Sequence, residues 1–312
     1  MLTSVASASS GGLLDALPLL LEVAPLAAIG YAYLRRASTL AARGRAVPPA
    51  RQLAFGAGLL LVFTAVGTPL AHVSEELFSA HMVQHILLGD LGALLLALGL
   101  TGPVLAPLLR LPVVGRLRVL SHPVVALPLW VLNLYLWHLS ALYQATLSSA
   151  PVHALMHSLI LVLGLAMWLP LVGPLPTPRW FGDLAKLAYV VLVRLAGAAL
   201  ANVFIWADVV FYPDYRPGQA HWGIGPLADQ GVAGSVLMLE GSLITVLLLA
   251  WLFLRAAGRD EDRQRLLDLA EERGVELSDG RAGRAAAAGT GAGAALERRL
   301  RGAGTQRESE ER

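Results

Sequence analysis

Residues 152–172 read VHALMHSLILVLGLAMWLPLV and contain no Asp, Glu, Lys or Arg. A helix that crosses a bilayer needs about 20 predominantly apolar residues. This stretch therefore predicts a membrane-spanning helix. It also contains His153 and His157, which are four residues apart and so lie on one face of a helix, one turn from each other.

Six further stretches have the same apolar character, and the connections between them are short and rich in turn-forming residues, such as VPPA, TGPV and GPLPTP. The sequence therefore predicts an all-α membrane protein with a bundle of seven transmembrane helices over residues 1–256. The predicted spans are residues 13–34, 52–70, 81–100, 123–143, 152–172, 187–207 and 229–254.

The composition agrees with a membrane protein. The 312 residues are 56% hydrophobic and 15% charged, whereas a soluble domain carries about 25% charged residues. The charges also concentrate near the C-terminus, because 12 of the 24 basic and 12 of the 22 acidic residues follow Leu254. Residues 257–312 are predicted to be a charged, largely disordered cytoplasmic tail. The net charge of +2 is the sum over an apolar body and a charged tail, so it gives no sign of a nucleic-acid partner. We predict none.

Basic residues in short loops set the orientation of a membrane protein, with the positive side in the cytoplasm. The loops after the first, third and fifth predicted spans carry ten basic residues, whereas the opposite loops carry only Arg216. We therefore expect the N-terminus outside and the C-terminus in the cytoplasm. The ten are Arg35, Arg36, Arg43, Arg45, Arg51, Arg110, Arg116, Arg118, Arg179 and Lys186.

In this orientation, seven of the eight histidines fall at the extracytoplasmic end of the bundle. Only His122 lies on the cytoplasmic side, and His221 lies in an outer loop. Two pairs have helical i, i+4 spacing: His81 with His85, and His153 with His157. Imidazole is the commonest protein metal ligand and is costly to place in a bilayer without a partner. The clustering therefore predicts a metal or haem site on the outer face.

The absence of cysteine excludes thiolate ligands and leaves a metal to His, Met and carboxylates. Met82 lies inside the first pair, and its thioether suits Cu(I). Copper is therefore the predicted metal. The candidate ligands are His81, His85, His153, His157, His72, His138 and Met82.

Three ionisable residues within the predicted spans form a second candidate site. Asp90, Arg194 and Glu240 all reach a similar depth near the middle of the membrane at 1.5 Å per helical residue. Each must face the protein interior and find a partner. Pairing of Arg194 with Asp90 or Glu240 is predicted, either as a structural ion pair or as part of a proton or cation path to the histidines.

Three motifs resemble the CtaG family of bacterial assembly factors for caa-type cytochrome c oxidase. They are HMVQHILL from His81, HALMHSLILVLGLAMWLPLVGP from His153, and DQGVAGSVLMLEGS from Asp229. The resemblance covers roughly residues 50–256. It implies a seven-helix protein of the bacterial cytoplasmic membrane that assists oxidase assembly and copper delivery. It also implies metal handling by the two histidine pairs and adds Asp229 and Gln230 as further motif positions.

The leading functional prediction is therefore a non-enzymatic cytochrome c oxidase assembly factor that handles copper through its extracytoplasmic histidines. Its expected partners are oxidase subunits and the lipid bilayer. Two alternatives remain at this point. An intramembrane zinc-dependent hydrolase would use three histidines and an activated water. A haem-binding membrane protein would use one axial histidine from each of two facing helices.

Overall fold

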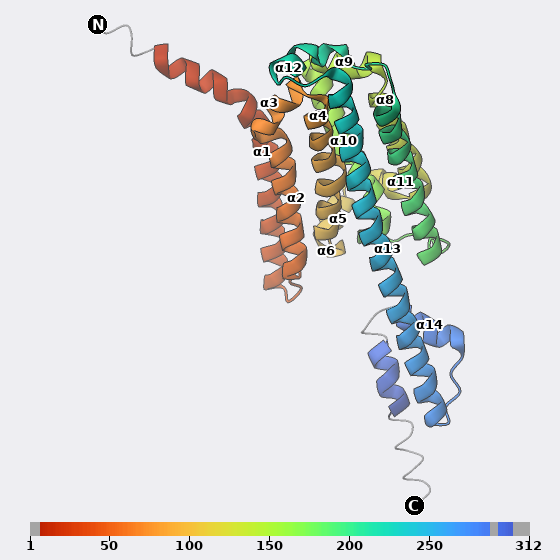
Figure 1. Ribbon diagram of the computed structural model, residues 1–312. Coiled ribbons are helices and arrows are strands. Elements are labelled where there is room, and N and C mark those ends of the chain that lie inside the picture. Colours follow the sequence, from red (N-terminus) through yellow and green to blue (C-terminus); the bar gives the residue numbers. More distant parts are fainter. Residues whose placement is uncertain (1–6, 288–292, 302–312) are drawn as a thin grey trace, which may run out of the picture. The chain divides into compact units, whose positions relative to one another are not determined.

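The computed structural model describes residues 7–287 and 293–301, and side chains within these ranges from residue 23 onward except at positions 113, 114 and 117. All regular structure in the described residues is helical (Figure 1). The chain divides into two compact units, Met1–Leu243 and Ile244–Arg312. The first unit contains the predicted histidine site.

Five helical segments in the described residues are long and apolar enough to cross a membrane. Each overlaps a span predicted from the sequence, although α13 continues well beyond residue 254. The helix α1 (Ser7–Ala42) packs along α2 but is not one of the five, and its side chains up to residue 22 lie outside the described part. The five are α2 (Pro49–Gly67), the segment Phe78–Gly99, α10 (Ala150–Val172), α11 (Asp183–Trp206) and α13 (Pro226–Glu272).

The predicted span 123–143 differs from the structure, because its helix breaks at His138. The two parts, α8 (Pro123–Trp137) and α9 (Ser140–Ser148), are bent by 71° and count as a sixth span only if taken together. The His138 ring nitrogen Nδ1 lies 2.6 Å from the carbonyl oxygen of Leu134, and the His138 carbonyl accepts a hydrogen bond from the Tyr212 hydroxyl. These side-chain contacts take the place of continued helical bonding.

The segment Phe78–Gly99 also differs from a regular α-helix. It consists of α4 (Phe78–His85), a π-helical turn η1 (Ile86–Gly92) and α5 (Ala93–Gly99). Such turns are rare and occur most often at functional sites. Here the turn lies directly after the second histidine of the HMVQH motif.

Tight helix packing brings α4, η1 and α5 against α2 and α10. A Cβ atom on Gly164 of α10 would overlap the carbonyl group of Gly89 in η1, and one on Gly89 would lie 2.6 Å from Ile160 Cγ2. The two backbones therefore approach each other at a contact that only glycine permits, which is typical of membrane helices. This contact fixes the helices that carry the two histidine pairs.

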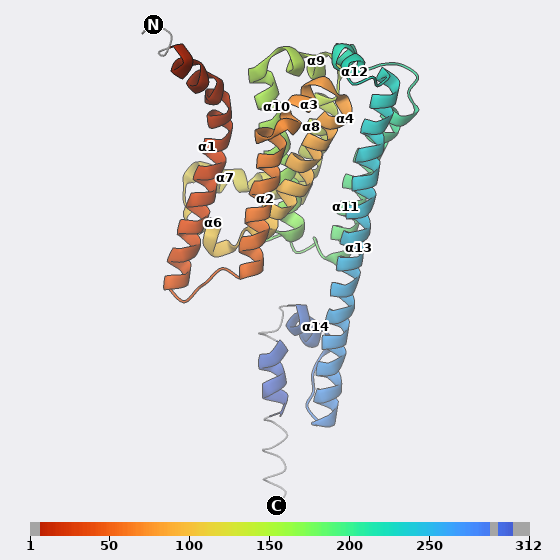
Figure 2. The ribbon, with the colours of Figure 1, turned by 60° about the vertical axis from the view of Figure 1, so that its left-hand side comes forward.

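Three short helices lie together at one end of the bundle (Figures 1 and 2). They are α3 (Pro69–Glu76), α9 and α12 (Arg216–His221), and α12 packs against α3. Both α4 and α10 begin at this end, so their histidines lie beneath the short helices. The remaining short elements of the first unit are α6 (Gly102–Leu109), α7 (Pro112–Leu117), η2 (Arg118–Ser121) and η3 (Pro213–Tyr215).

The second unit contains helices in its described residues. Its described residues form the last part of α13, the helix α14 (Asp279–Ala287) and a further helical stretch over residues 293–301. Leu266 and Ala270 lie one turn apart on α13 and pack with Ala282 and Leu300. Large apolar residues are few in this unit, and small alanines complete the packing. The last eleven predicted tail positions, 302–312, lie outside the described residues.

Candidate metal centre

The first histidine pair is buried on α4. His81 is fully buried and His85 is 7% exposed. One helical turn separates them, and their Nε2 atoms face each other at 2.8 Å. Two imidazole nitrogens this close share a hydrogen between them, and a metal ion that binds both nitrogens replaces that hydrogen.

The second pair lies on α10 and faces the first. The Nε2 atoms of His153 and His157 are 3.1 Å apart. The ring of His153 stacks on that of His81, with centroids 5.3 Å apart. The His157 ring lies 5.7 Å from the His81 ring and 5.6 Å from the His85 ring. The structure thus brings together all four histidines of the two sequence motifs.

His138 joins these four from the break between α8 and α9. Its ring centroid lies 5.8 Å from that of His85. Its Nδ1 bonds to the Leu134 carbonyl, while its Nε2 is buried without a hydrogen-bond partner among the described residues. Metal-binding histidines show this pattern, because a hydrogen bond at one nitrogen fixes the ring and leaves the other free for the metal. We call His81, His85, His138, His153 and His157 the histidine cluster.

The cluster has a donor set that fits a metal ion. One nitrogen each from His81, His85 and His157 lie within 4.8 Å of one another. Metal–nitrogen bonds are about 2.0–2.1 Å long, so two nitrogens on one ion lie at most about 4.2 Å apart. A small movement of three rings therefore suffices for coordination. The buried Nδ1 of His81 also has no hydrogen-bond partner within the described part of the chain.

Two predicted ligands lie apart from the cluster. His72 is exposed on α3, and no ring contact or hydrogen bond joins it to the cluster in the described residues. Met82 is fully buried, but it packs in an aromatic core with Phe78, Tyr143 and Phe204. Met82 directly follows His81 on α4, so its side chain points to another side of the helix, toward this core. Met82 therefore contributes to the packing of the core.

Two buried tyrosines beside the cluster, Tyr143 and Tyr215, were not predicted from the sequence. The Tyr143 ring lies 5.2 Å from the His81 ring, and its hydroxyl lies 3.0 Å from the Tyr215 hydroxyl. Burial raises the pKa of Tyr215, which therefore stays protonated and donates a hydrogen bond to the Ser74 carbonyl. These tyrosines come from distant segments, so no local spacing could have grouped them.

Asp229 connects α13 to the start of α4. This carboxylate is fully buried and accepts hydrogen bonds from the backbone N–H groups of Phe78 and Ser79, at 2.8 and 3.0 Å, and from Gln219 Nε2. Leu77, which precedes α4, supplies no side-chain cap. Asp229 therefore caps the helix that carries His81 and His85, where a negative charge is favoured.

Gln230, the next residue, holds the loop that follows α11. Its Oε1 accepts a hydrogen bond from the Phe211 N–H, and its Nε2 donates to the Val209 carbonyl. Both motif positions on α13 therefore bind backbone groups at the end of the bundle where α4 and α13 begin. Neither contributes a nitrogen to the histidine cluster.

The three intramembrane charges meet in the bundle. Arg194 on α11 donates two hydrogen bonds to Asp90 on η1, at 2.7 and 2.9 Å. Glu240 on α13 lies 3.8 Å from the same guanidinium. The side chains of all three are 11–14% exposed. The sequence predicted a similar depth in the membrane for these three residues, and the structure places them in one cluster.

A family model described as the cytochrome c oxidase caa3 assembly factor matches residues 31–259. The chain belongs to this family. The matched range contains all five histidines of the cluster, the capping residue Asp229 and the three intramembrane charges. The family match therefore covers every residue of the candidate metal centre.

The chain also resembles two longer mycobacterial proteins. It is 27% identical over 274 residues to the uncharacterised proteins Mb0105 of Mycobacterium bovis and MT0111 of Mycobacterium tuberculosis. The alignment covers 78% of this chain and 40% of each relative. The chain thus spans less than half the length of these relatives. No solved structure matches the chain significantly.

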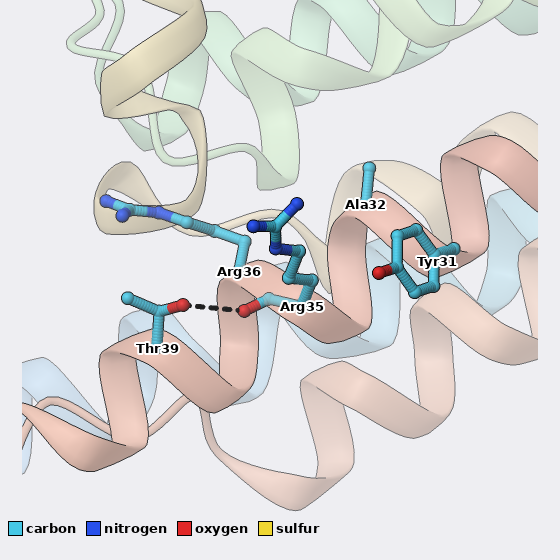
Figure 3. Close-up of a pocket in the computed structure, with 5 residues that line it drawn as sticks. All are labelled: Tyr31, Ala32, Arg35, Arg36 and Thr39. Atoms are coloured by element: carbon cyan, nitrogen blue, oxygen red, sulfur yellow. Dashed lines mark hydrogen bonds between the residues drawn. The ribbon is translucent and has the colours of Figure 1, made fainter.

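The protein has a separate pocket on α1 (Figure 3). Thr39 Oγ1 donates a hydrogen bond to the Arg35 carbonyl, and the Arg36 guanidinium donates to the Pro103 carbonyl. The pocket contains none of the clustered histidines, so it is not part of the candidate metal centre. Its lining residues are Tyr31, Ala32, Arg35, Arg36 and Thr39.

Proposed function

We propose that this oxidase assembly factor binds Cu(I) at the histidine cluster on the extracytoplasmic side of the membrane and passes it to cytochrome c oxidase. Copper is the cargo of this process and not a resident cofactor. The observation that carries the proposal is the approach of nitrogens from His81, His85 and His157 to within 4.8 Å of one another in a buried setting. Imidazole nitrogens suit copper, and the chain has no cysteine to compete for it.

The proposed side of the membrane follows from a seven-helix count. The bent pair α8–α9 forms one span. The 36 residues of α1 extend about 54 Å as a helix, which exceeds a hydrocarbon core of about 30 Å, so α1 forms another. With these two counted as spans, the ten-to-one bias of basic loop residues supports an N-terminus outside. The cluster then lies at the extracytoplasmic end of a bacterial cytoplasmic membrane protein.

The geometry favours copper transfer over the two alternatives. A zinc hydrolase needs a base beside the metal, whereas the candidate ligand group consists of histidines and the nearby carboxylate Asp90 is bound by Arg194. A haem needs an open slot between two axial histidines. The rings of the facing pairs lie 5.3–5.7 Å apart at their centroids and leave no room for a macrocycle.

Copper titration of the purified protein against a competing Cu(I) chelator tests the site. We expect one high-affinity ion per chain and a loss of at least about 100-fold in affinity for the double variant His81→Ala/His85→Ala. His72→Ala is the matched control, because this histidine is exposed and outside the cluster. Unchanged affinity in the double variant would refute the site, and stoichiometric zinc without copper in the purified protein would support the hydrolase.

Delivery is tested separately in cells that lack the factor. The double variant should restore less cytochrome c oxidase activity than the wild-type chain at equal protein level, and added copper should recover part of the difference. His72→Ala should restore activity fully. Full activity from the double variant would separate oxidase assembly from the histidine cluster.

A further inference from the structure

The cluster of Asp90, Arg194 and Glu240 contains two acidic groups and one basic group, so ion pairing alone does not neutralise it. Two carboxylates and one guanidinium come from three different elements and meet within the membrane-spanning bundle. If both carboxylates were ionised, the cluster would carry one uncompensated negative charge. An unpaired charge away from water is costly, whereas one added proton makes the cluster neutral.

The hydrogen bonds identify which carboxylate takes the proton. Asp90 binds both terminal nitrogens of Arg194 in a bidentate pair, the strongest arrangement of these two groups. Glu240 Oε1 lies 3.8 Å from Arg194 Nη1, beyond hydrogen-bond distance, and is buried without a hydrogen-bond partner among the described residues. Asp90 therefore keeps its negative charge and Glu240 is the group that binds a proton.

In the part of the chain that the structure describes, no salt bridge joins Glu240 to a charge other than Arg194. The charged groups that face it are Asp90 on η1 and Arg194 on α11. From α10, the ring of Trp168 lies 5.1 Å from the guanidinium carbon of Arg194 and carries no charge. The ring covers the guanidinium by a cation–π contact, which further confines the positive charge to the pair with Asp90.

The π-helical turn places this cluster below the histidines. Asp90 lies in η1, five residues after His85. Hydrogen bonding from i to i+5 adds a residue to the turn, so residues five apart come close to the same helix face. A regular α-helix would turn Asp90 away from that face. The turn thus brings Asp90 closer to the helix face that carries the histidine pair than a regular α-helix would.

We propose that Asp90, Arg194 and Glu240 form an intramembrane proton-binding site, in which the ionised Asp90–Arg194 pair stays fixed and Glu240 binds and releases one proton. The reaction is the loss of a proton from the Glu240 carboxylic acid to give the carboxylate, with no other bond changed. The site lets the protein change its buried charge by one unit, as the entry or exit of a monovalent cation in the same bundle requires. It does not depend on which metal the histidine cluster binds.

Infrared spectroscopy of the metal-free protein in lipid nanodiscs at neutral pH tests the proposal directly. A protonated carboxylic acid has a carbonyl stretch distinct from that of a carboxylate or an amide, and it shifts in heavy water. We expect this band in the wild-type protein and its loss in Glu240→Gln. Glu76→Gln is the matched control and should keep the band, because Glu76 lies at the surface with His221 and Trp222.

A second variant tests the charge balance. In Asp90→Asn, only Glu240 remains to neutralise Arg194, so Glu240 should ionise and the band should disappear there too. Absence of the band in the wild-type protein would overturn the proposal, as would its persistence in Glu240→Gln or in Asp90→Asn. The wild-type measurement holds even if a variant fails to fold. None of these outcomes depends on copper, so failure here is distinct from failure of the copper site.

Discussion

Asp229 shows how one buried carboxylate positions the candidate metal ligands. It belongs to α13, yet both its oxygens accept hydrogen bonds at the start of α4, 150 and 151 residues away in sequence. The residue before α4, Leu77, has no polar side chain for this purpose. The orientation of His81 and His85 therefore depends on a residue that lies outside the histidine cluster.

We predict that Asp229→Asn lowers the free energy of unfolding by about 2 kcal/mol, because hydrogen bonds to a charged acceptor are replaced by weaker ones. It should also weaken copper binding, since α4 loses its cap while all five histidines remain. Thermal unfolding and copper titration of the purified protein measure both effects. Asp208→Asn, which changes an exposed carboxylate, is the control. Equal stability of the two variants would contradict the capping role.

At this scale the sequence predicted the grouping of the histidines better than the residues that hold them in place. The i, i+4 spacing identified His81, His85, His153 and His157, and the structure brings all four together. His138 was a candidate by depth alone, and its free Nε2 depends on a helix break that the sequence did not indicate. Met82 was chosen by ligand chemistry, but its direction on α4 places it in the aromatic core.

At the scale of helices, the contact between Gly164 on α10 and Gly89 on η1 sets the separation of the two histidine pairs. The backbones meet where any side chain on Gly164 would overlap the Gly89 carbonyl group. The apolar pattern predicted that both segments span the membrane, but it could not show which helices touch. The π-helical turn and the bend at His138 were missed for a related reason. Both depend on contacts with distant segments, whereas hydropathy describes only how apolar each stretch of sequence is.

Gly164→Ala should force α10 and η1 apart and reduce Cu(I) affinity by at least about tenfold, because the ligands come from both helices. The change removes no ligand, so the loss would come from geometry alone. Gly231→Ala is the matched control, since a Cβ atom there meets no atom within 4 Å. Both variants are compared by copper titration at equal folded fraction. Wild-type affinity in Gly164→Ala would show that this helix contact does not position the site.

At the scale of the whole molecule, orientation decides whether the histidine cluster faces the correct compartment. Charge bias in the loops predicts that the end of the bundle with the histidine cluster is extracytoplasmic and that the C-terminal residues are cytoplasmic. The helical structure of the second unit is compatible with either side.

The chain contains no cysteine, so single introduced cysteines report topology without background. Asp208→Cys lies in the predicted outer loop and Arg45→Cys in a predicted cytoplasmic loop, and both positions are exposed. A membrane-impermeant thiol reagent should label Asp208→Cys in intact cells and Arg45→Cys only after lysis. The reverse pattern would place the histidine cluster on the cytoplasmic side.

X-ray absorption at the copper edge of the Cu(I)-loaded protein tests the central claim most directly. The histidine cluster predicts a first shell of nitrogen alone, at about 2 Å, with the outer scattering typical of imidazole rings. The same sample prepared from His81→Ala/His85→Ala should retain no bound copper. Methionine is the sulfur source in this chain, so sulfur in the first shell would mean that copper binds outside the cluster and would contradict the account.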